Sequence, residues 1–250
     1  MELKEVLIKS TIDGTMQPSL IAKCDLEGKR PLLVDLHTWS ADRFNHKSRL
    51  AYAECHGFHL VLPEFRGPNL ISNPHCTEAC GSVLAMQDIK DAIDYMIANA
   101  KVDTDNIFIV GCSGGGHMAL MMAGYCPTLF KAVAAFVPVT DLVRWKDENE
   151  HYGKHVIACT GGDIEEMKKR SPVSYIDEIA KANVKIFAGK YDHLVPFRHT
   201  LDFYNLMLEK HPEARIYIDI YDAGHQYDGA LFEHWLNSQY KEAELGEVTG

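Results

Sequence analysis

The first residues of the chain alternate apolar and polar side chains, which is the pattern of a β-strand with one buried face. Residues 3–11 and 17–23 both alternate, and Asp13-Gly14 between them is typical of a tight turn, so we expect an antiparallel hairpin at a sheet edge. Beyond residue 30, short apolar runs predict buried strands at 31–36, 59–62, 106–110, 132–137, 184–188 and 216–220. Apolar residues at helical spacing predict helices at 82–100, 114–125, 200–210 and 229–240.

The order of these elements predicts the fold class. Strands that alternate with helices form a mainly parallel sheet with helices on both faces. The class is therefore α/β, with about eight strands, and residues 1–250 are expected to form a single domain. The polar and aromatic segment 138–183 lies between two strands, and we expect it to be a short lid or substrate wall. A solvated pair of helices would give the same pattern.

A pentapeptide of the form G-x-S-x-G, from Gly111 to Gly115, lies between a predicted strand and a predicted helix. This arrangement is typical of a nucleophile elbow, in which a serine occupies a sharp strand-to-helix turn. Glycine is needed at both ends of the motif because a Cβ would collide with neighbouring main chain. We therefore predict that Ser113 is a nucleophile, although a glycine-rich turn without chemistry has the same sequence form.

A serine hydroxyl needs a base that takes its proton and a carboxylate that orients the base. Asp192 follows the strand at 184–188 and His225 follows the strand at 216–220, so both should reach the sheet edge where Ser113 lies. The order Ser, Asp, His is that of enzymes built around such an elbow. The predicted catalytic residues are therefore Ser113, Asp192 and His225. Three alternatives are less well placed along the chain. Asp222 and Asp163 are the alternative acids, and His193 is the alternative base.

An oxyanion formed during acyl transfer is stabilised by two N–H donors. One is expected from Gly114, at the start of the helix, and the other from the loop that follows the strand at 31–36. We assign the second donor to Trp39, with Thr38 as the fallback. Three side chains near these groups or in the 138–183 segment are expected to contact substrate: His37, Cys112 and Trp145.

Composition excludes several classes of function. Asp and Glu outnumber Lys and Arg by 35 to 25, and the net charge of −10 disfavours nucleic acid or an anionic membrane as partner. No apolar run approaches the length of a membrane span, and residues 1–9 lack the layout of a secretory signal. Seven cysteines, an odd number, indicate reduced thiols. We expect a cytoplasmic protein.

No cofactor is expected. The glycines from Gly114 to Gly116 are not followed by the lysine of a phosphate-binding loop. Soft ligands lie close together between His75 and Cys80, but no second ligand pair stands at recognisable spacing, so no metal site is predicted. The expected substrate is a small-molecule ester or a short peptide, and a homo-oligomer stays open.

These motifs together resemble the catalytic domain of the prolyl oligopeptidase-like serine hydrolases, within the α/β-hydrolase superfamily. The resemblance covers residues 30–240 and rests on short motifs: His37 to Ser40, Pro63 to Gly67, Gly111 to Gly115, Ser171-Pro172, Gly189 to Asp192, Val195-Pro196 and Gly224-His225. It implies an α/β-hydrolase fold and the same catalytic serine, aspartate and histidine. Arg66 matches an Arg-Gly of the family, where an ion pair is as good an expectation as substrate contact.

The resemblance does not by itself distinguish hydrolysis of an ester bond from hydrolysis of a peptide bond. The family's oligopeptidases carry an N-terminal propeller domain that gates entry, which this sequence lacks, whereas esterases with the same catalytic domain commonly lack it. We therefore expect a serine hydrolase that cleaves small acyl or carbohydrate esters through an acyl-enzyme. A prolyl oligopeptidase-like serine peptidase acting on short peptides is the first alternative. A non-catalytic receptor or scaffold with the same fold is the second.

Overall fold

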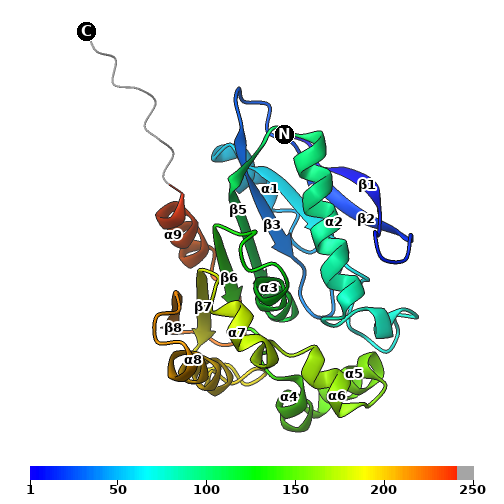
Figure 1. Cartoon of the computed structure of the whole chain (residues 1–250), viewed down its shortest axis with the longest axis vertical. Coiled ribbons are helices and arrows are strands. Elements are labelled where there is room, and N and C mark those ends of the chain that lie inside the picture. The colour runs from blue at the N-terminus through cyan, green and yellow to red at the C-terminus, as the bar shows by residue number, and fades with distance from the viewer. Residues whose placement is uncertain (241–250) are drawn as a thin grey trace.

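The computed structural model describes residues 1–240, and within them the strands form one eight-stranded sheet. Their bounds are β1 (Lys4–Lys9), β2 (Met16–Ala22), β3 (Arg30–Leu36), β4 (His59–Pro63), β5 (Val102–Cys112), β6 (Ala132–Phe136), β7 (Val184–Gly189) and β8 (Ile216–Tyr221). The order across the sheet is β1-β2-β4-β3-β5-β6-β7-β8 (Figure 1). β1 pairs antiparallel with β2, and β2 with β4, while the other neighbours are parallel. The predicted α/β fold with an antiparallel N-terminal hairpin is confirmed.

Helices cover both faces of this sheet. Their bounds are α1 (Arg49–Cys55), α2 (Val83–Asn99), α3 (Gly114–Tyr125), α4 (Leu142–Glu148), α5 (Glu150–Thr160), α6 (Ile164–Lys169), α7 (Ile176–Ile179), α8 (Arg198–Lys210) and α9 (Gly229–Gln239), with short 3₁₀ turns η1 (Cys76–Glu78) and η2 (Pro172–Tyr175). α1 and α9 bury apolar side chains on one face. α2, α3, α7 and α8 bury theirs on the other. Burial on both faces explains why the central strands are mostly apolar.

β5 and α1 differ most from the prediction. β5 begins at Val102, four residues before the predicted start, because Val102 pairs with Arg30 across an irregularity in the β3–β5 register. The polar residues between 103 and 106 hid this extension from a search for apolar runs. α1 was not predicted at all. Only Tyr52 and Ala53 of its seven residues are buried, which is too few to produce a helical period.

The 138–183 segment folds into short helices, of which α4, α5 and α6 lie beyond the carboxyl ends of the strands (Figure 1). Asp141, Asn149 and Asp163 precede α4, α5 and α6, and their side chains accept hydrogen bonds from N–H groups of the first turn. These caps explain why a polar segment forms helices. Its role as a lid or wall stays a prediction, as does the single domain over 1–250, of which residues 241–250 lie outside the described part.

Among residues 1–240, no helix combines the length and apolar character that crossing a membrane requires. Over the same residues, no cluster of three or more His, Cys, Asp or Glu side chains is arranged to hold a metal ion. The seven cysteines are free thiols. The cytoplasmic location stays a prediction.

Candidate active site

Ser113 occupies the turn between β5 and α3. Its φ of 57° and ψ of −115° are rarely adopted by residues that carry a side chain. The turn is held by the Ser113 N–H, which donates to the Phe136 carbonyl at 2.8 Å, and by the His117 N–H, which donates to the Ser113 carbonyl at 2.8 Å. A Cβ on Gly111 would lie 2.2 Å from the Gly115 backbone, so glycine is required where strand and helix cross. The Ser113 hydroxyl is therefore carried on a rigid turn.

The structure brings Ser113, His225 and Asp192 together from three separate loops. The Nε2 atom of His225 lies 2.8 Å from the Ser113 Oγ, and its Nδ1 atom lies 2.7 Å from the Asp192 Oδ2. Because an ionised carboxylate only accepts hydrogen bonds, Nδ1 carries the proton and Nε2 is left to accept one from Ser113. This arrangement can deprotonate a serine for attack on an acyl carbon.

The Asp192 carboxylate is held by backbone amides. Its side chain is fully buried, and its Oδ1 atom accepts the N–H groups of Leu194 and Val195, both at 2.8 Å. The loops that carry the acid and the base run in contact, because a Cβ on Gly189 would lie 2.1 Å from the Gly224 carbonyl oxygen. Glycine at 189 therefore lets the two loops approach closely enough for the Asp192–His225 hydrogen bond.

The rival acids and base lie elsewhere. Asp222 is exposed, and its carboxylate lies 3.8 Å from the Lys190 ammonium. Asp163 caps the start of α6. His193 is exposed. None of the three rivals hydrogen-bonds to Ser113 within residues 1–240.

Two backbone N–H groups lie beside each other at Trp39 and Gly114. A Cβ on Gly114 would lie 2.5 Å from the Trp39 nitrogen, so the loop after β3 runs directly against the start of α3. Neither N–H donates to another residue in the described part of the chain. The Thr38 N–H, in contrast, donates to the Asn45 Oδ1 at 3.0 Å. Of the three donors named from the sequence, Trp39 and Gly114 are therefore available to an oxyanion and Thr38 is not.

A pocket of about 300 Å³ opens over Ser113 and His225. Cys112 forms part of its wall, and burial raises the pKa of this thiol to about 12, so the thiol stays neutral. Tyr152 of α5, which was not predicted from the sequence, also lines the pocket. The full lining consists of Thr38, Trp39, Ser40, His46, Cys112, Ser113, Tyr152, His225, Gln226 and Tyr227.

His37 and Trp145 do not line this pocket, contrary to the expectation that they contact substrate. His37 is buried, with its two ring nitrogens 2.8 and 2.9 Å from main-chain carbonyl oxygens. Trp145 is buried edge-on against Trp39, with ring centroids 4.9 Å apart, and its Nε1 donates to the Leu194 carbonyl at 2.7 Å. Both side chains therefore support the loops around the site instead of facing its opening.

A second Asp–His pair borders the same pocket. The Asp35 carboxylate, near the end of β3, lies 2.6 Å from the His46 Nδ1 and 2.5 Å from the Arg49 Nε. Burial would raise the pKa of Asp35, but the neighbouring cations outweigh it and the pKa is lowered. The Arg49 guanidinium in turn lies 4.8 Å from the ring centroid of Tyr227. This cluster was not predicted from the sequence, where its only signal is an acidic residue within an apolar strand.

Arg66 belongs to an ion-pair network. Its side chain is 2% exposed and contacts the carboxylates of Asp88 at 2.5 Å, Glu78 at 2.7 Å and Asp13 at 2.8 Å. These partners join the N-terminal hairpin to the start of α2 and its preceding loop. Of the two expectations for this arginine, the structure therefore contains the ion pair.

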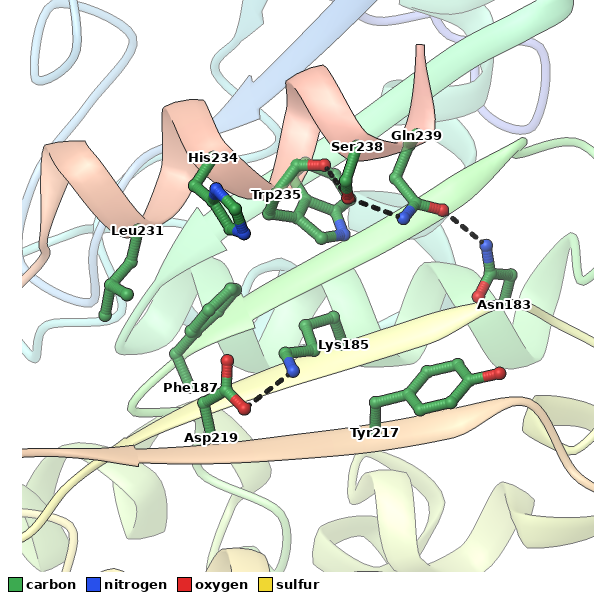
Figure 2. Close-up of a pocket in the computed structure, with 10 residues that line it drawn as sticks. All are labelled: Asn183, Lys185, Phe187, Tyr217, Asp219, Leu231, His234, Trp235, Ser238 and Gln239. Carbon is green, nitrogen blue, oxygen red and sulfur yellow. Dashed lines mark hydrogen bonds and ion pairs between the residues drawn. The ribbon is translucent and has the colours of Figure 1, made fainter. Parts of the chain in front are cut away.

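A separate pocket of about 280 Å³ lies between α9 and the last two strands (Figure 2). Lys185 of β7 pairs with Asp219 of β8 at 2.8 Å, and the Asn183 side chain donates to Gln239 of α9 at 2.9 Å. Figure 2 shows these polar groups bound to one another. The lining of this second pocket includes none of the residues that line the pocket over Ser113, so it is not part of the candidate active site.

The chain is similar in sequence to acylamino-acid-releasing enzyme 1 from Oryza sativa subsp. japonica. The two are 26% identical over 228 residues, which are 83% of this chain and 29% of the relative. The chain therefore spans less than a third of the length of that relative.

Two solved structures share the fold. The uncomplexed acylaminoacyl peptidase of Pyrococcus horikoshii superposes with a TM-score of 0.81 at 22% identity, over 98% of this chain and 43% of that one. A puromycin-hydrolyzing peptidase of Mycobacterium tuberculosis superposes with a TM-score of 0.79 at 15% identity, over 95% of this chain and 38% of that one. Both likenesses establish the fold.

The prediction of an ester hydrolase was wrong. A sequence model of the prolyl oligopeptidase family matches residues 45–242, and the sequence relative named above is an acylamino-acid-releasing enzyme. The preference for esters rested on the expectation that no propeller domain is present. The extent of the sequence does not bear on the bond cleaved, because the same Ser-His-Asp geometry hydrolyses esters and amides. The resemblance itself is confirmed, and since the match covers most of its length, the chain belongs to the prolyl oligopeptidase family.

Proposed function

We propose that this protein is a serine peptidase that cleaves short N-acylated peptides and releases the acylated amino acid. The observation that carries the proposal is the continuous hydrogen-bonded path from Ser113 through His225 to Asp192, at 2.8 and 2.7 Å. Membership of the prolyl oligopeptidase family and similarity to an acylamino-acid-releasing enzyme support the choice of an amide bond. The pocket of about 300 Å³ suits a short substrate.

In the proposed reaction, the Ser113 Oγ attacks the scissile carbonyl carbon while the His225 Nε2 takes its proton. The carbonyl oxygen becomes an oxyanion, which accepts hydrogen bonds from the Trp39 and Gly114 N–H groups. His225 then protonates the leaving nitrogen, the C–N bond breaks, and an ester links the acyl group to Ser113. Water attacks this ester, His225 takes the water proton, and the returned proton restores the serine hydroxyl. Asp192 orients the imidazole and stabilises its cationic form throughout.

We assign the 138–183 segment to the wall of the pocket. The support for this role is Tyr152 of α5, which is the residue of that segment that lines the pocket over Ser113. Trp39 and Trp145 pack behind it, with Trp145 and Tyr152 stacked at 5.2 Å between ring centroids. An aromatic stack of this kind fixes the tyrosine at low entropic cost.

The proposal is tested by labelling with a fluorophosphonate probe and by turnover of acetyl-alanine p-nitroanilide. Wild type should be labelled and should release p-nitroaniline, and Ser113→Ala should lose both. Ser48→Ala is the matched control, because Ser48 is exposed and its side chain makes no capping bond. A wild-type protein that stays unlabelled, or binds the anilide without turning it over, would support a scaffold instead. Turnover of p-nitrophenyl acetate with no turnover of any acylated amide would overturn the peptidase assignment.

A further inference from the structure

His46 is a titratable residue of the Ser113 pocket that the proposed chemistry does not use. Its side chain is 17% exposed and lines the pocket together with Ser113, His225 and Tyr227. Its Nδ1 atom is bound to Asp35 at 2.6 Å, whereas its Nε2 atom makes no hydrogen bond to any residue between 1 and 240. Nε2 is also absent from the buried polar atoms that lack a partner in this part of the chain, so it reaches solvent within the pocket. The imidazole is therefore fixed at one nitrogen and open at the other.

The charge of this imidazole is set by the groups around it. Burial alone would lower the pKa of His46, but the Asp35 carboxylate outweighs burial and raises the pKa above its ordinary value. Arg49 already balances the charge of Asp35, so a protonated His46 adds one positive charge to the pocket. The titratable groups around His46 are Asp35 of β3, His37 in the loop after β3, Arg49 of α1, Cys112 of β5, His225 after β8 and Tyr227 before α9.

A positive N–H donor in a small pocket has one natural partner among the parts of a peptide. A carboxylate accepts charge-assisted hydrogen bonds, which are shorter and stronger than those to neutral groups. The net charge of the chain is −10, so its overall field repels a carboxylate and a local cation is needed to hold one. The pocket of about 300 Å³ also keeps any group of a short substrate near both His46 and Ser113.

We propose that His46 is a specificity-determining residue that binds a substrate carboxylate beside Ser113. This inference rests on the proposed peptidase function and deepens it, because it names the class of short peptide that is preferred. Nε2–H donates to the carboxylate, and Asp35 and Arg49 position the ring. The carboxylate has three sources in a short acylated peptide: the free C-terminus of the leaving group, an acidic side chain at the cleaved residue, or an acidic acyl group.

Matched substrate pairs distinguish these sources. Acetyl-Ala-Ala and its C-terminal amide differ only in the terminal carboxylate. Acetyl-Glu and acetyl-Gln p-nitroanilides differ only in the side chain, and succinyl-Ala and acetyl-Ala p-nitroanilides differ in the acyl group. In wild type, we expect kcat/KM to favour the carboxylate member of one pair by about tenfold, the size of one charge-assisted hydrogen bond. The difference should appear mainly in KM, since the carboxylate is bound before and during the reaction.

His46→Gln removes the cation and should bring that ratio close to one. His46→Asn is the second variant, because its amide can still donate to Asp35 from the position of Nδ1 while nothing replaces Nε2. His75→Gln is the matched control, since the His75 side chain is 66% exposed and lies outside the pocket, and it should keep the wild-type ratio. A wild type that turns over the neutral substrates but shows no preference in any pair would overturn the inference and leave the peptidase function standing. A preference that survives both His46 variants would overturn it too.

The wild-type protein alone provides a further test. The ratio of kcat/KM within the preferred pair should be high at pH 6 and should fall toward one as the pH rises through the His46 pKa, because the imidazolium then loses its charge. Taking the ratio at each pH cancels any pH effect that is common to both substrates. The substrate carboxylate stays ionised over this range, since its own pKa is about 4. A ratio that is constant from pH 6 to pH 9 would contradict the assignment to His46.

Discussion

Two Asp–His pairs border one pocket, and they differ in how the second carboxylate oxygen is bound. In Asp192–His225, that oxygen accepts two uncharged backbone N–H groups, at 2.8 Å each. In Asp35–His46, it binds the Arg49 guanidinium. The first carboxylate therefore keeps an unbalanced negative charge for the imidazolium that forms during the proposed reaction. The second is balanced already, so a proton on His46 gives the pocket a surplus positive charge. The same two residue types therefore suit proton transfer at His225 and a retained proton at His46.

The largest effect should come from removing the first imidazole. His225→Gln leaves Ser113 without a proton acceptor, and kcat for acetyl-alanine p-nitroanilide should fall by on the order of 10⁶-fold. Stopped assays at high enzyme concentration measure the residual rate. The matched exchange His75→Gln, at an exposed site, should leave kcat at the wild-type value. If His225→Gln retained a tenth of wild-type activity, His225 would not be the base, and the difference in role between the two Asp–His pairs would be contradicted.

Neutralising the first carboxylate should cost less. Asp192→Asn keeps the shape of the side chain but no longer fixes the proton on the His225 Nδ1, and loss of this orienting charge in such a triad costs about 10⁴ in kcat. Steady-state kinetics with the same anilide measure it, and circular dichroism verifies the fold. A loss under tenfold would show that Asp192 does not orient the base.

Neutralising the second carboxylate should affect stability. The Asp35 side chain is 1% exposed and that of Arg49 is 11% exposed, so Asp35→Asn leaves a largely desolvated guanidinium without its countercharge. This change should lower the free energy of unfolding by about 3 kcal/mol. Urea titration followed by tryptophan fluorescence measures this change. Asp219→Asn serves as control, because its ion pair with Lys185 involves a carboxylate that is 49% exposed, and such pairs contribute below about 1 kcal/mol. Equal losses in the two variants would contradict the buried role of Asp35.

The smallest effect concerns pH. The pKa of His46 is raised in the folded protein, so the native state binds its proton more tightly than the unfolded chain does. This contribution to stability is complete below the ordinary histidine pKa of about 6.5 and is lost as the pH rises through the folded-state value. Urea midpoints at pH 6 and pH 9 should therefore differ more in wild type than in His46→Gln. An identical pH dependence in the two proteins would show that His46 carries no linked proton.

The contrast between the pairs also marks what the sequence could predict. The elbow was readable because Gly111 and Gly115 are local requirements of a strand-to-helix turn. Asp192 and His225 could be placed because each follows a recognisable strand, and the structure brings both to Ser113. These arguments need only the chain order and the direction of parallel strands.

The remaining features depend on how separate segments pack against one another, which the order of elements along the chain does not predict. Asp35 could be identified only as an isolated acidic residue in an apolar strand. Of its partners, His46 lies in a loop and Arg49 lies on a helix too short to produce a period. Trp145 and Tyr152 are both aromatic residues of one segment, and which of them faces the pocket is decided by how α4 packs on α5. The choice of ester over amide failed for a different reason, because the catalytic geometry is common to both reactions.

The contact between Gly114 and Trp39 links the nucleophile turn to the loop after β3, since any side chain at 114 would fall within 2.5 Å of the Trp39 backbone. Residue 114 therefore cannot gain a side chain unless the loop around Trp39 changes with it. If the proposed function holds, a directed-evolution library that varies residue 114 should yield active clones only when positions around 39 are randomised with it. The two loops of this protein should therefore be engineered together.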